Sequence, residues 1–424
     1  MTRSDTVSAM GTSRLKDDLL IAVVNGIARL LFHVHSGLTI LGTVAIAACL
    51  VPALVYAGYS ILTADGLLSG ASGLLLSVIA GVVLLVLACV GVGLAGTRDL
   101  DANPFQRQSY GDGFRNRLAA KRDGFMAWMS HVKCIRWPFL LVLDPVGNGI
   151  KGEDVRQLLS VIKPGDILLR GHRGYVEGLL ISLTGTRGNA RRLTHAAVYI
   201  GDTTAEDEAI VAADLQVNMG GGAWRAARPD EQELIRTDQR FYQTGPQRVL
   251  HAMALGVFTE DILSFVHCDY MAVIRLTSDE IKLDPCDMAG TLHRSAEPSA
   301  PGGTGSGARD IEQRLTQGEA VPLAEILAAG RRSVLGKIGS LYDFQFDDVR
   351  DHNTFSCSSL AYYCLKSVQT YIGLVPTRKV FMGRFFARDT ITPADLYEVA
   401  ARHCQRGASG RLQIVWESAS LGKT

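Results

Sequence analysis

The longest apolar stretches of the chain lie near its start and carry no charge. Residues 38–62 and 67–96 contain no Asp, Glu, Lys or Arg, and only the short connector from Thr63 to Gly66 separates them. Each stretch exceeds the roughly 20 residues that a helix needs to cross the apolar core of a bilayer. Apolarity on every face of a helix is typical of lipid surroundings. The pattern therefore predicts two transmembrane helices, joined as a hairpin over residues 38–96.

Basic residues flank this predicted hairpin and are absent from its connector. They are Arg3, Arg14, Lys16 and Arg29 before it and Arg98, Arg107, Arg115 and Arg117 after it. The positive-inside rule then puts both ends in the cytoplasm, with residues 1–37 as a cytoplasmic segment and the bilayer of a bacterial inner membrane as a partner. A protein secreted into another compartment would escape this rule. The linker 97–150 mixes aromatic and basic residues, which suits either a membrane interface or packing on the next domain.

From residue 151 onward the hydrophobic pattern breaks into shorter segments, which together predict an α+β domain over residues 151–424. Helical spacing is expected at 154–162, 311–318, 323–338 and 391–396, and strand-like runs at 167–170, 193–201, 209–217 and 270–276. Lys163 to Asp166 reads as a turn. The Pro/Gly/Ser-rich stretch 298–307 predicts a flexible insertion near 277–310.

One cysteine stands at a predicted helix start. An acidic stretch from Tyr342 ends at Phe355, and an apolar helical pattern begins within Ser356-Cys357-Ser358-Ser359. The free N–H groups and the positive end of a helix dipole favour an anion there, so this position favours the thiolate, the nucleophilic form of cysteine. The alternative is a small buried side chain, which is the common fate of a free cysteine. Cys364, two turns further along the same helix stripe, is predicted to be core.

One histidine stands at the start of a predicted strand, LTHAAVYIG (193–201). Period-2 alternation puts His195, Ala197 and Tyr199 on one face and Ala196, Val198 and Ile200 on the other. A lone strand histidine is commonly structural, but His195 is also the obvious base for a cysteine at a helix start.

Composition narrows the function classes. The chain has 424 residues, with 43 basic against 42 acidic side chains, so no charge excess argues for nucleic acid. Its eight cysteines are scattered without a paired framework, which fits a reducing compartment for the part outside the membrane. No zinc-ligand spacing, Gly-rich phosphate loop or G-x-S-x-G elbow occurs in its proper context, so neither a metal nor a cofactor is expected.

The order of six segments resembles the permuted papain-like amidases of the NlpC superfamily, of YiiX/YaeF type. The segments are KPGDILLR (163–170), LTHAAVYIG (193–201), AVIRL (272–276), GSLYDFQF (339–346), FSCSSLAYYCL (355–365) and ITPADL (391–396). In papain the cysteine precedes the histidine along the chain, whereas here His195 precedes Cys357, as in the permuted group. The resemblance covers residues 160–400 and leaves out the hairpin, the linker and the insertion.

The resemblance implies an antiparallel sheet that carries the histidine, with the cysteine helix packed on it. It also implies a covalent acyl-enzyme that hydrolyses or transfers an amide or ester. Cys357 then matches the nucleophile and His195 the general base, with the Cys357 backbone N–H as an oxyanion donor and Tyr342 and Asp343 near the site. The family's third, acidic residue is missing: Ala212 stands at its expected place. Asp214, on the same predicted strand face, is the preferred substitute and Glu208 the alternative.

Three functions remain open at this point. The preferred one is a membrane-anchored cysteine hydrolase or acyltransferase acting on lipid or acylated substrates through a thioester. The second is a cell-wall peptidase with the domain outside the cytoplasm, against the charge distribution. The third is a non-catalytic papain-like membrane adaptor, a hypothesis kept open by the missing acid. The sequence does not identify the natural substrate, a protein partner or the oligomeric state.

Overall fold

The computed structural model describes residues 102–110, 119–120, 122–124, 126–127, 132–135, 140–143, 149–173, 188–220, 223–283, 306–344, 346, 349, 352–381, 386–407 and 410–421. The chain divides into two units. One unit consists of residues 1–89 and 133–143, where β1 (Val132–Ile135) pairs with β2 (Leu140–Leu143). The other unit, 90–132 and 144–424, contains the remaining elements.

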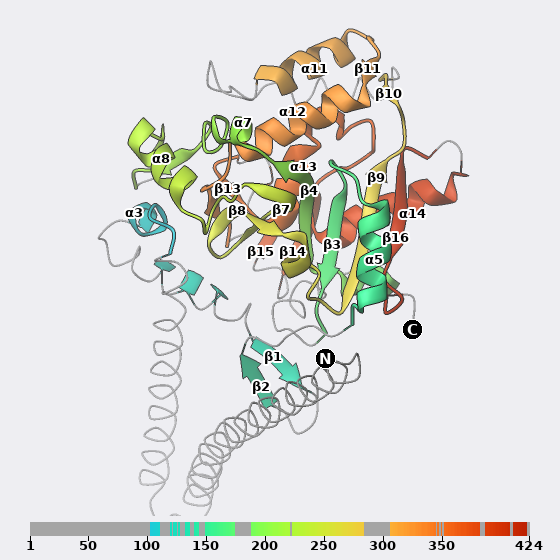
Figure 1. Cartoon of the computed structure of the whole chain (residues 1–424), viewed down its shortest axis with the longest axis horizontal. Helices are drawn as coiled ribbons and strands as arrows, with labels where there is room; N and C mark the ends of the chain where they lie inside the picture. The colour runs from blue at the N-terminus through green and yellow to red at the C-terminus, as the bar shows by residue number, and fades with distance from the viewer. Residues whose placement is uncertain are drawn as a thin grey trace, which may run out of the picture. The chain divides into compact units, whose positions relative to one another are not determined.

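A six-stranded antiparallel sheet forms the centre of the larger unit (Figure 1). In spatial order its strands are β16 (Leu412–Glu417), β9 (Tyr270–Leu276), β3 (Ile167–Gly171), β4 (His195–Thr203), β7 (Gly245–Met253) and β8 (Gly256–Asp261). The turn before β3 uses Gly165 at a φ of +94°, a backbone region that favours glycine. Along the β3–β4 ladder Arg170 lies opposite His195, and Leu250 of β7 lies opposite Val198 on the other side of β4.

One face of this sheet packs against helix α13 (Cys357–Cys364), and we call it the α13 face. Ala196 and Val198 of β4 share its core with Leu360 of α13. Helices α11 (Ser306–Thr316), α12 (Leu323–Leu335) and α14 (Pro393–Gln405) complete this layer. A Cβ atom at Gly330 of α12 would stand 2.6 Å from the carbonyl oxygen of Cys364, so the missing side chain lets α12 approach α13 closely.

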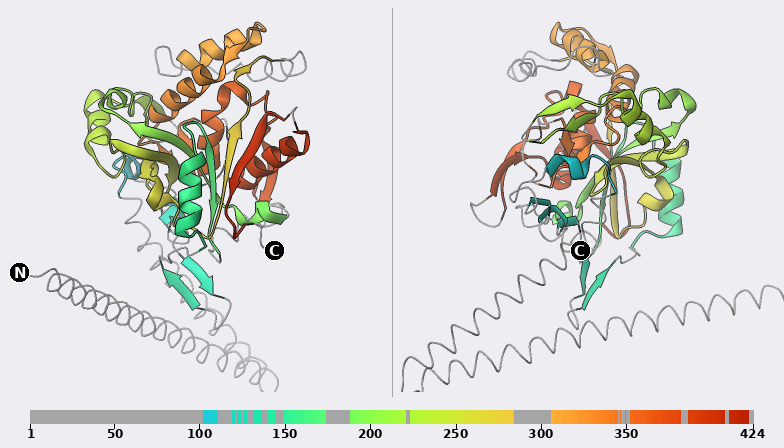
Figure 2. Two further views of the ribbon diagram at one scale, coloured as in Figure 1. Left: turned by 45° about the vertical axis from the view of Figure 1, so that its right-hand side comes forward. Right: turned by 90° about the vertical axis from the view of Figure 1, so that its left-hand side faces the viewer.

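The opposite face of the sheet packs against α5 (Gly152–Val161) and the short helix α9 (Ile262–Phe265), and we call it the α5 face. Ala197 and Tyr199 of β4 lie there, in a separate core with Leu158 and Phe265. Figure 2 (right) shows the sheet between turquoise α5 on one side and the orange and red helices on the other. The predicted alternation of side chains along β4 is therefore confirmed.

The remaining elements connect these layers. The helical ones are α3 (Gln106–Tyr110), η1 (Gly188–Arg192), α7 (Ala205–Glu208), α8 (Pro229–Thr237) and η2 (Lys366–Val368). Besides β1 and β2, four pairs of short strands form two-stranded sheets. They are β5 (Gln216–Asn218) with β6 (Trp224–Ala226), β10 (Glu280–Ile281) with β11 (Val321–Pro322), β12 (Leu341–Tyr342) with β13 (Thr354–Phe355), and β14 (Thr377–Phe381) with β15 (Phe386–Thr390). Most of the predicted insertion, residues 284–305, lies outside the described residues.

The predicted fold class needs a correction. The described part is α+β with an antiparallel sheet and a helix that begins at Cys357, as expected. The two membrane-spanning helices that the same prediction included are not supported, because no helix among the described residues is both long and apolar enough to cross a membrane. The residues expected to form them, 38–62 and 67–96, lie outside the described residues.

Candidate active site

Cys357 is the first residue of α13, as the sequence predicted. Ser356 caps the helix: its Oγ accepts a hydrogen bond from the backbone N–H of Ser359 at 3.2 Å, and its own N–H donates to the Ser359 Oγ at 2.8 Å. The first N–H groups of a helix have no acceptor within the helix, so the thiol lies at a partial positive charge. Its residue is only 4% exposed.

Tyr342 and Asp343 lie beside the segment that leads into Cys357. Strand β12 runs parallel to β13, and the N–H of Asp343 donates to the carbonyl of Phe355 at 3.0 Å. The Tyr342 ring packs edge-on against the Phe344 ring, with 4.9 Å between centroids. These contacts hold the chain before Cys357 in place and give Tyr342 a packing role.

His195 is the first residue of β4, and its imidazole lies on the α5 face. Its Nε2 atom is 2.9 Å from Nδ1 of His251, which lies on the neighbouring strand β7 and is completely buried. The two rings meet edge to face, and the Phe265 ring packs against both. The sheet therefore places a second histidine against the predicted base.

A carboxylate extends this contact into a chain of three side chains. Nε2 of His251 is 3.3 Å from Oε2 of Glu260, on edge strand β8. Burial raises the pKa of Glu260 above its ordinary value, while the positive charge of Arg170 opposes this shift. Adjacent strands β4, β7 and β8 thus each contribute one residue to a line of polar side chains that runs from His195 to Glu260.

Arg170 lies beside this chain on β3 and is only 8% exposed. Its Nη1 donates to the carbonyl of Phe265 at 2.9 Å and lies 3.8 Å from Oε2 of Glu260. The guanidinium carbon stands 4.1 Å from the centre of the Phe265 ring, and Nη2 contacts the sulfur of Met253 at 3.6 Å. A buried cation is therefore fixed next to the two histidines.

The two histidines are held in the neutral form. Burial lowers the pKa of both His195 and His251 well below 6.5, because an apolar environment disfavours the charged imidazolium. The charge of Arg170 lowers both pKa values further. A ready-made thiolate–imidazolium pair is consequently disfavoured at neutral pH.

Cys357 and His195 lie at the same end of the sheet but toward different faces. The N–H of Val257, at the start of β8, donates to the carbonyl of Ser340 at 2.9 Å, which brings β12 and β13 to the end where β7 finishes and β4 begins. Helix α13 packs on the α13 face, whereas the His195 ring points to the α5 face. His195 contacts His251 and Phe265, and Arg170 and His172 act on it electrostatically, whereas no hydrogen bond or ring contact joins His195 to Cys357 among the described residues.

Glu208 follows the end of β4 that is opposite His195, and Asp214 lies in a turn and not on a strand. The strand predicted over 209–217 is wrong: α7 ends at Glu208, a turn follows, and β5 begins only at Gln216. Within the turn Ala212 has a φ of +59°, which interrupts an extended run. The Asp214 N–H donates to Gly336, and its carbonyl accepts from the Lys337 side chain, so its backbone is tied to the segment after α12.

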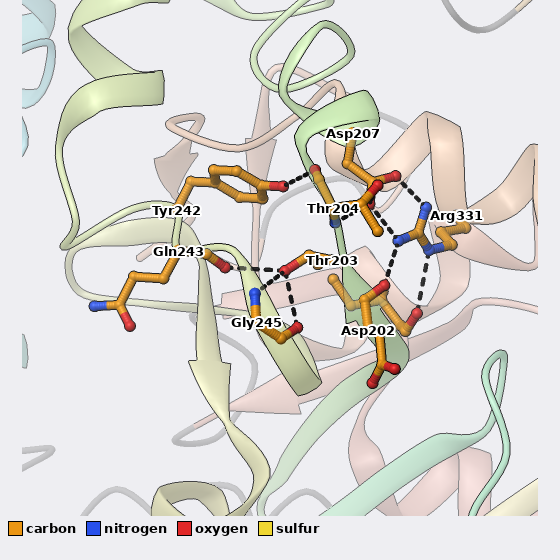
Figure 3. A network of polar contacts seen from close by, with 9 residues as sticks. Asp202, Thr203, Thr204, Asp207, Tyr242, Gln243, Gly245 and Arg331 are labelled. Carbon is orange, nitrogen blue, oxygen red and sulfur yellow. Dashed lines mark hydrogen bonds and ion pairs between the residues drawn. The ribbon is translucent and has the colours of Figure 1, made fainter.

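A polar network explains why the chain turns after β4 (Figure 3). Asp207 accepts from the N–H of Thr204 at 2.8 Å and pairs with Arg331 of α12, which lowers the pKa of this carboxyl. The same guanidinium donates to the carbonyls of Ile200 and Asp202. Glu208, exposed beside this network, is at the end of β4 away from His195. The network holds α7 and α12 together at that end.

His251, Glu260 and Arg170 are the residues that the sequence analysis missed. The one signal for His251 was a histidine inside the strand-like run from Val249 to Met253. That signal does not show which strand lies beside β4, because residues 204–244, which contain α7, β5, β6 and α8, separate β4 from β7.

In the described part of the chain, no group of three or more His, Cys, Asp or Glu side chains is arranged to hold a metal ion. Comparison with known protein families found no family model that matches this chain, and no curated protein matches it either.

Proposed function

We propose that this chain is a cysteine-dependent hydrolase or acyltransferase of the permuted papain-like type, with Cys357 as nucleophile and His195 as general base. The observation that carries the proposal is the chain from His195 through His251 to Glu260, at the end of the sheet where α13 begins. A base supported by a second polar group, near a cysteine at a helix start, is the arrangement that thiol catalysis uses.

The tautomers of the two histidines follow from the acidic end of this chain. Nε2 of His251 approaches Oε2 of Glu260 at 3.3 Å without a well-formed hydrogen bond, and a carboxylate at this distance favours the tautomer of His251 with its hydrogen on Nε2. Nδ1 of neutral His251 is then an acceptor, and Nε2 of His195 donates to it. Nδ1 of His195 is left with its lone pair, which makes it a base. The third residue that the family pattern asks for is therefore proposed to be His251 in place of Asp214.

The reaction then proceeds in two stages. Nδ1 of His195 takes the proton of the Cys357 thiol while the sulfur attacks a carbonyl carbon, and N–H groups at the start of α13 stabilise the oxyanion. His195 returns the proton to the departing amine or alcohol, which leaves a thioester on Cys357. Water or a second acceptor, deprotonated by His195, then releases the acyl group. This sequence needs Nδ1 and the thiol to meet around the end of β4.

A second candidate, a papain-like domain that binds without turnover, is favoured by the opposite placement of the two side chains. Cys357 belongs to the α13 layer and is 4% exposed, while the His195 ring packs on Phe265 on the α5 face. In that case Cys357 is a core residue and the histidine chain is a buried structural network.

Acylation of the purified full-length chain separates the two candidates. We expect a short-chain p-nitrophenyl ester to give a burst of nitrophenol and a mass increase on the peptide that contains Cys357. Exposed Cys404 is an internal control in the same digest, because it should react only as an ordinary thiol. Acyl esters, acyl amino acids, lipids and muropeptides then identify the substrate class.

Two variants complete the test. Cys357→Ala should remove both the burst and the modified peptide, and His195→Ala should slow acylation by about 10² to 10⁴-fold. Equal labelling of Cys357 and Cys404, unchanged in His195→Ala, would exclude the catalytic proposal and leave the binding domain.

A further inference from the structure

Arg170 is an unusual neighbour for a histidine pair. A cation beside a base that must accept a proton opposes the charged form of that base. Arg170 is nevertheless buried directly opposite His195 in the β3–β4 ladder, where paired side chains lie about 5 Å apart. Its contacts with Phe265 and Met253 fix the guanidinium on the α5 face, so the charge cannot swing out to solvent.

Charged and titratable groups of both signs surround the pair. Those that act on the pair or on Glu260 are Arg170, His172, Asp261 and His267. Glu260 is the carboxylate in contact with the pair, and Arg170 shares that carboxylate, with Nη1 at 3.8 Å from the same Oε2 atom that faces His251. Arg170 thereby neutralises part of the charge that would otherwise stabilise an imidazolium.

We infer that Arg170 is a positioning residue that keeps the His195–His251 pair uncharged and hydrogen-bonded, so that Nδ1 of His195 stays a free base down to mildly acidic pH. The inference rests on the proposed function, and it deepens that function. If both rings gained an additional proton, an N–H of His195 would face an N–H of His251 across the 2.9 Å contact and the hydrogen bond would break. Arg170 works against that state by opposing each proton that enters.

The direct test uses the imidazole signals of the full-length chain, labelled with ¹³C-histidine and followed by NMR against pH. His195→Gln and His251→Gln assign the two signals. In the unaltered protein both rings should stay neutral from pH 8 to pH 6. Arg170→Met removes the charge at similar length and should move the first protonation of the pair upward by at least about one pH unit. Arg170→Lys keeps the charge and should titrate like the unaltered protein.

Three results would overturn the inference. The first is a ring of the unaltered protein that gains its proton at pH 6.5 or above, a result that needs no Arg170 variant to fold. The second is an Arg170→Met protein that titrates unchanged. The third is an equal shift in Arg170→Met and Arg170→Lys, because a purely structural loss would not distinguish the charge.

Thiol acylation in the same samples separates this inference from the proposed function. A charge-dependent NMR shift together with no thioester on Cys357 means that the proposed function fails while the electrostatic role of Arg170 holds. If a thioester forms and the acidic limb of the kcat/KM–pH profile is the same in the unaltered protein, Arg170→Met and Arg170→Lys, the function holds and the role of Arg170 fails. Where both hold, the acidic limb of kcat/KM should move to higher pH in Arg170→Met only.

Discussion

The two ends of the proposed reaction are built by different kinds of interaction. On the α13 side, Cys357 is placed by neighbours in sequence: Ser356 and Ser359 close the cap within four residues. On the α5 side, His195 is placed by residues far away in the chain, His251 on β7 and Glu260 on β8. The first arrangement is local and tolerant of changes elsewhere, whereas the second exists only when three strands are in register.

Because of this difference, substitutions on the two sides should cost different amounts of free energy. A local cap contributes a modest free energy to one helix. A buried chain of polar groups loses much more when one member is removed, because its neighbours remain desolvated without their hydrogen bonds. The comparison predicts that the α5 side dominates the dependence of stability on pH, while changes to the cap that supports Cys357 on the α13 side have small effects.

The largest expected effect is on stability in acid. His195 and His251 have pKa values lowered by burial, so below pH 6.5 the unfolded chain binds two protons that the folded chain does not. Stability is then lost as the pH falls, with a limiting slope of about 2.7 kcal/mol per pH unit for two protons. The free energy of unfolding is measured with urea at a series of pH values. It should fall more steeply with decreasing pH in the unaltered protein than in the His195→Gln/His251→Gln double variant, by that amount.

Two other groups set the background of this measurement. Burial lowers the pKa of His352 to about 3, which acts in the same direction in both proteins. The raised pKa of Glu260 acts in the opposite direction, since the folded state takes up that proton first. Parallel slopes in the two proteins would mean that the histidine pair is already protonated, or exposed, in the native state.

A smaller effect is expected on catalysis when each of the two candidates for the third residue is substituted in turn. His251→Leu removes the acceptor for His195 and should lower kcat/KM for acyl transfer by about 10²-fold. Asp214→Asn changes a turn residue held by its backbone and should leave the rate within about twofold. The reverse ranking would restore Asp214 as the third residue and assign His251 to packing.

The smallest effect is expected at the helix start. Ser356→Ala removes the cap of α13 and should cost about 1 kcal/mol of stability, measured by urea unfolding. Thr392→Ala is a matched control, because Thr392 caps α14 with the same pattern of bonds. Both variants should lose similar stability, but only Ser356→Ala should change the alkylation rate of Cys357. An equal change in both would mean that the cap contributes nothing specific to the thiol.

The success of the sequence analysis follows the same division. The start of α13 at Cys357, the strand at His195 and the Thr392 cap depend on nearest neighbours, and the structure contains all three. The prediction of a strand at 209–217 was wrong, because the chain turns where Asp207 pairs with Arg331, a residue 124 positions further along the sequence. His251 was missed for the same reason, since the order of strands in a sheet is not written in any one segment.

The position of β16 at the edge of the sheet has a consequence during protein synthesis. Strand β9 pairs with β3 on one side and with β16 on the other, yet β16 is the last described strand to leave the ribosome. Until then, the apolar strand β9 presents an open row of backbone N–H and carbonyl groups, which is a template for pairing with another nascent chain. Translation speed between β9 and β16, and chaperones that shield this edge, should therefore set how much of the newly made protein reaches its native state rather than aggregates.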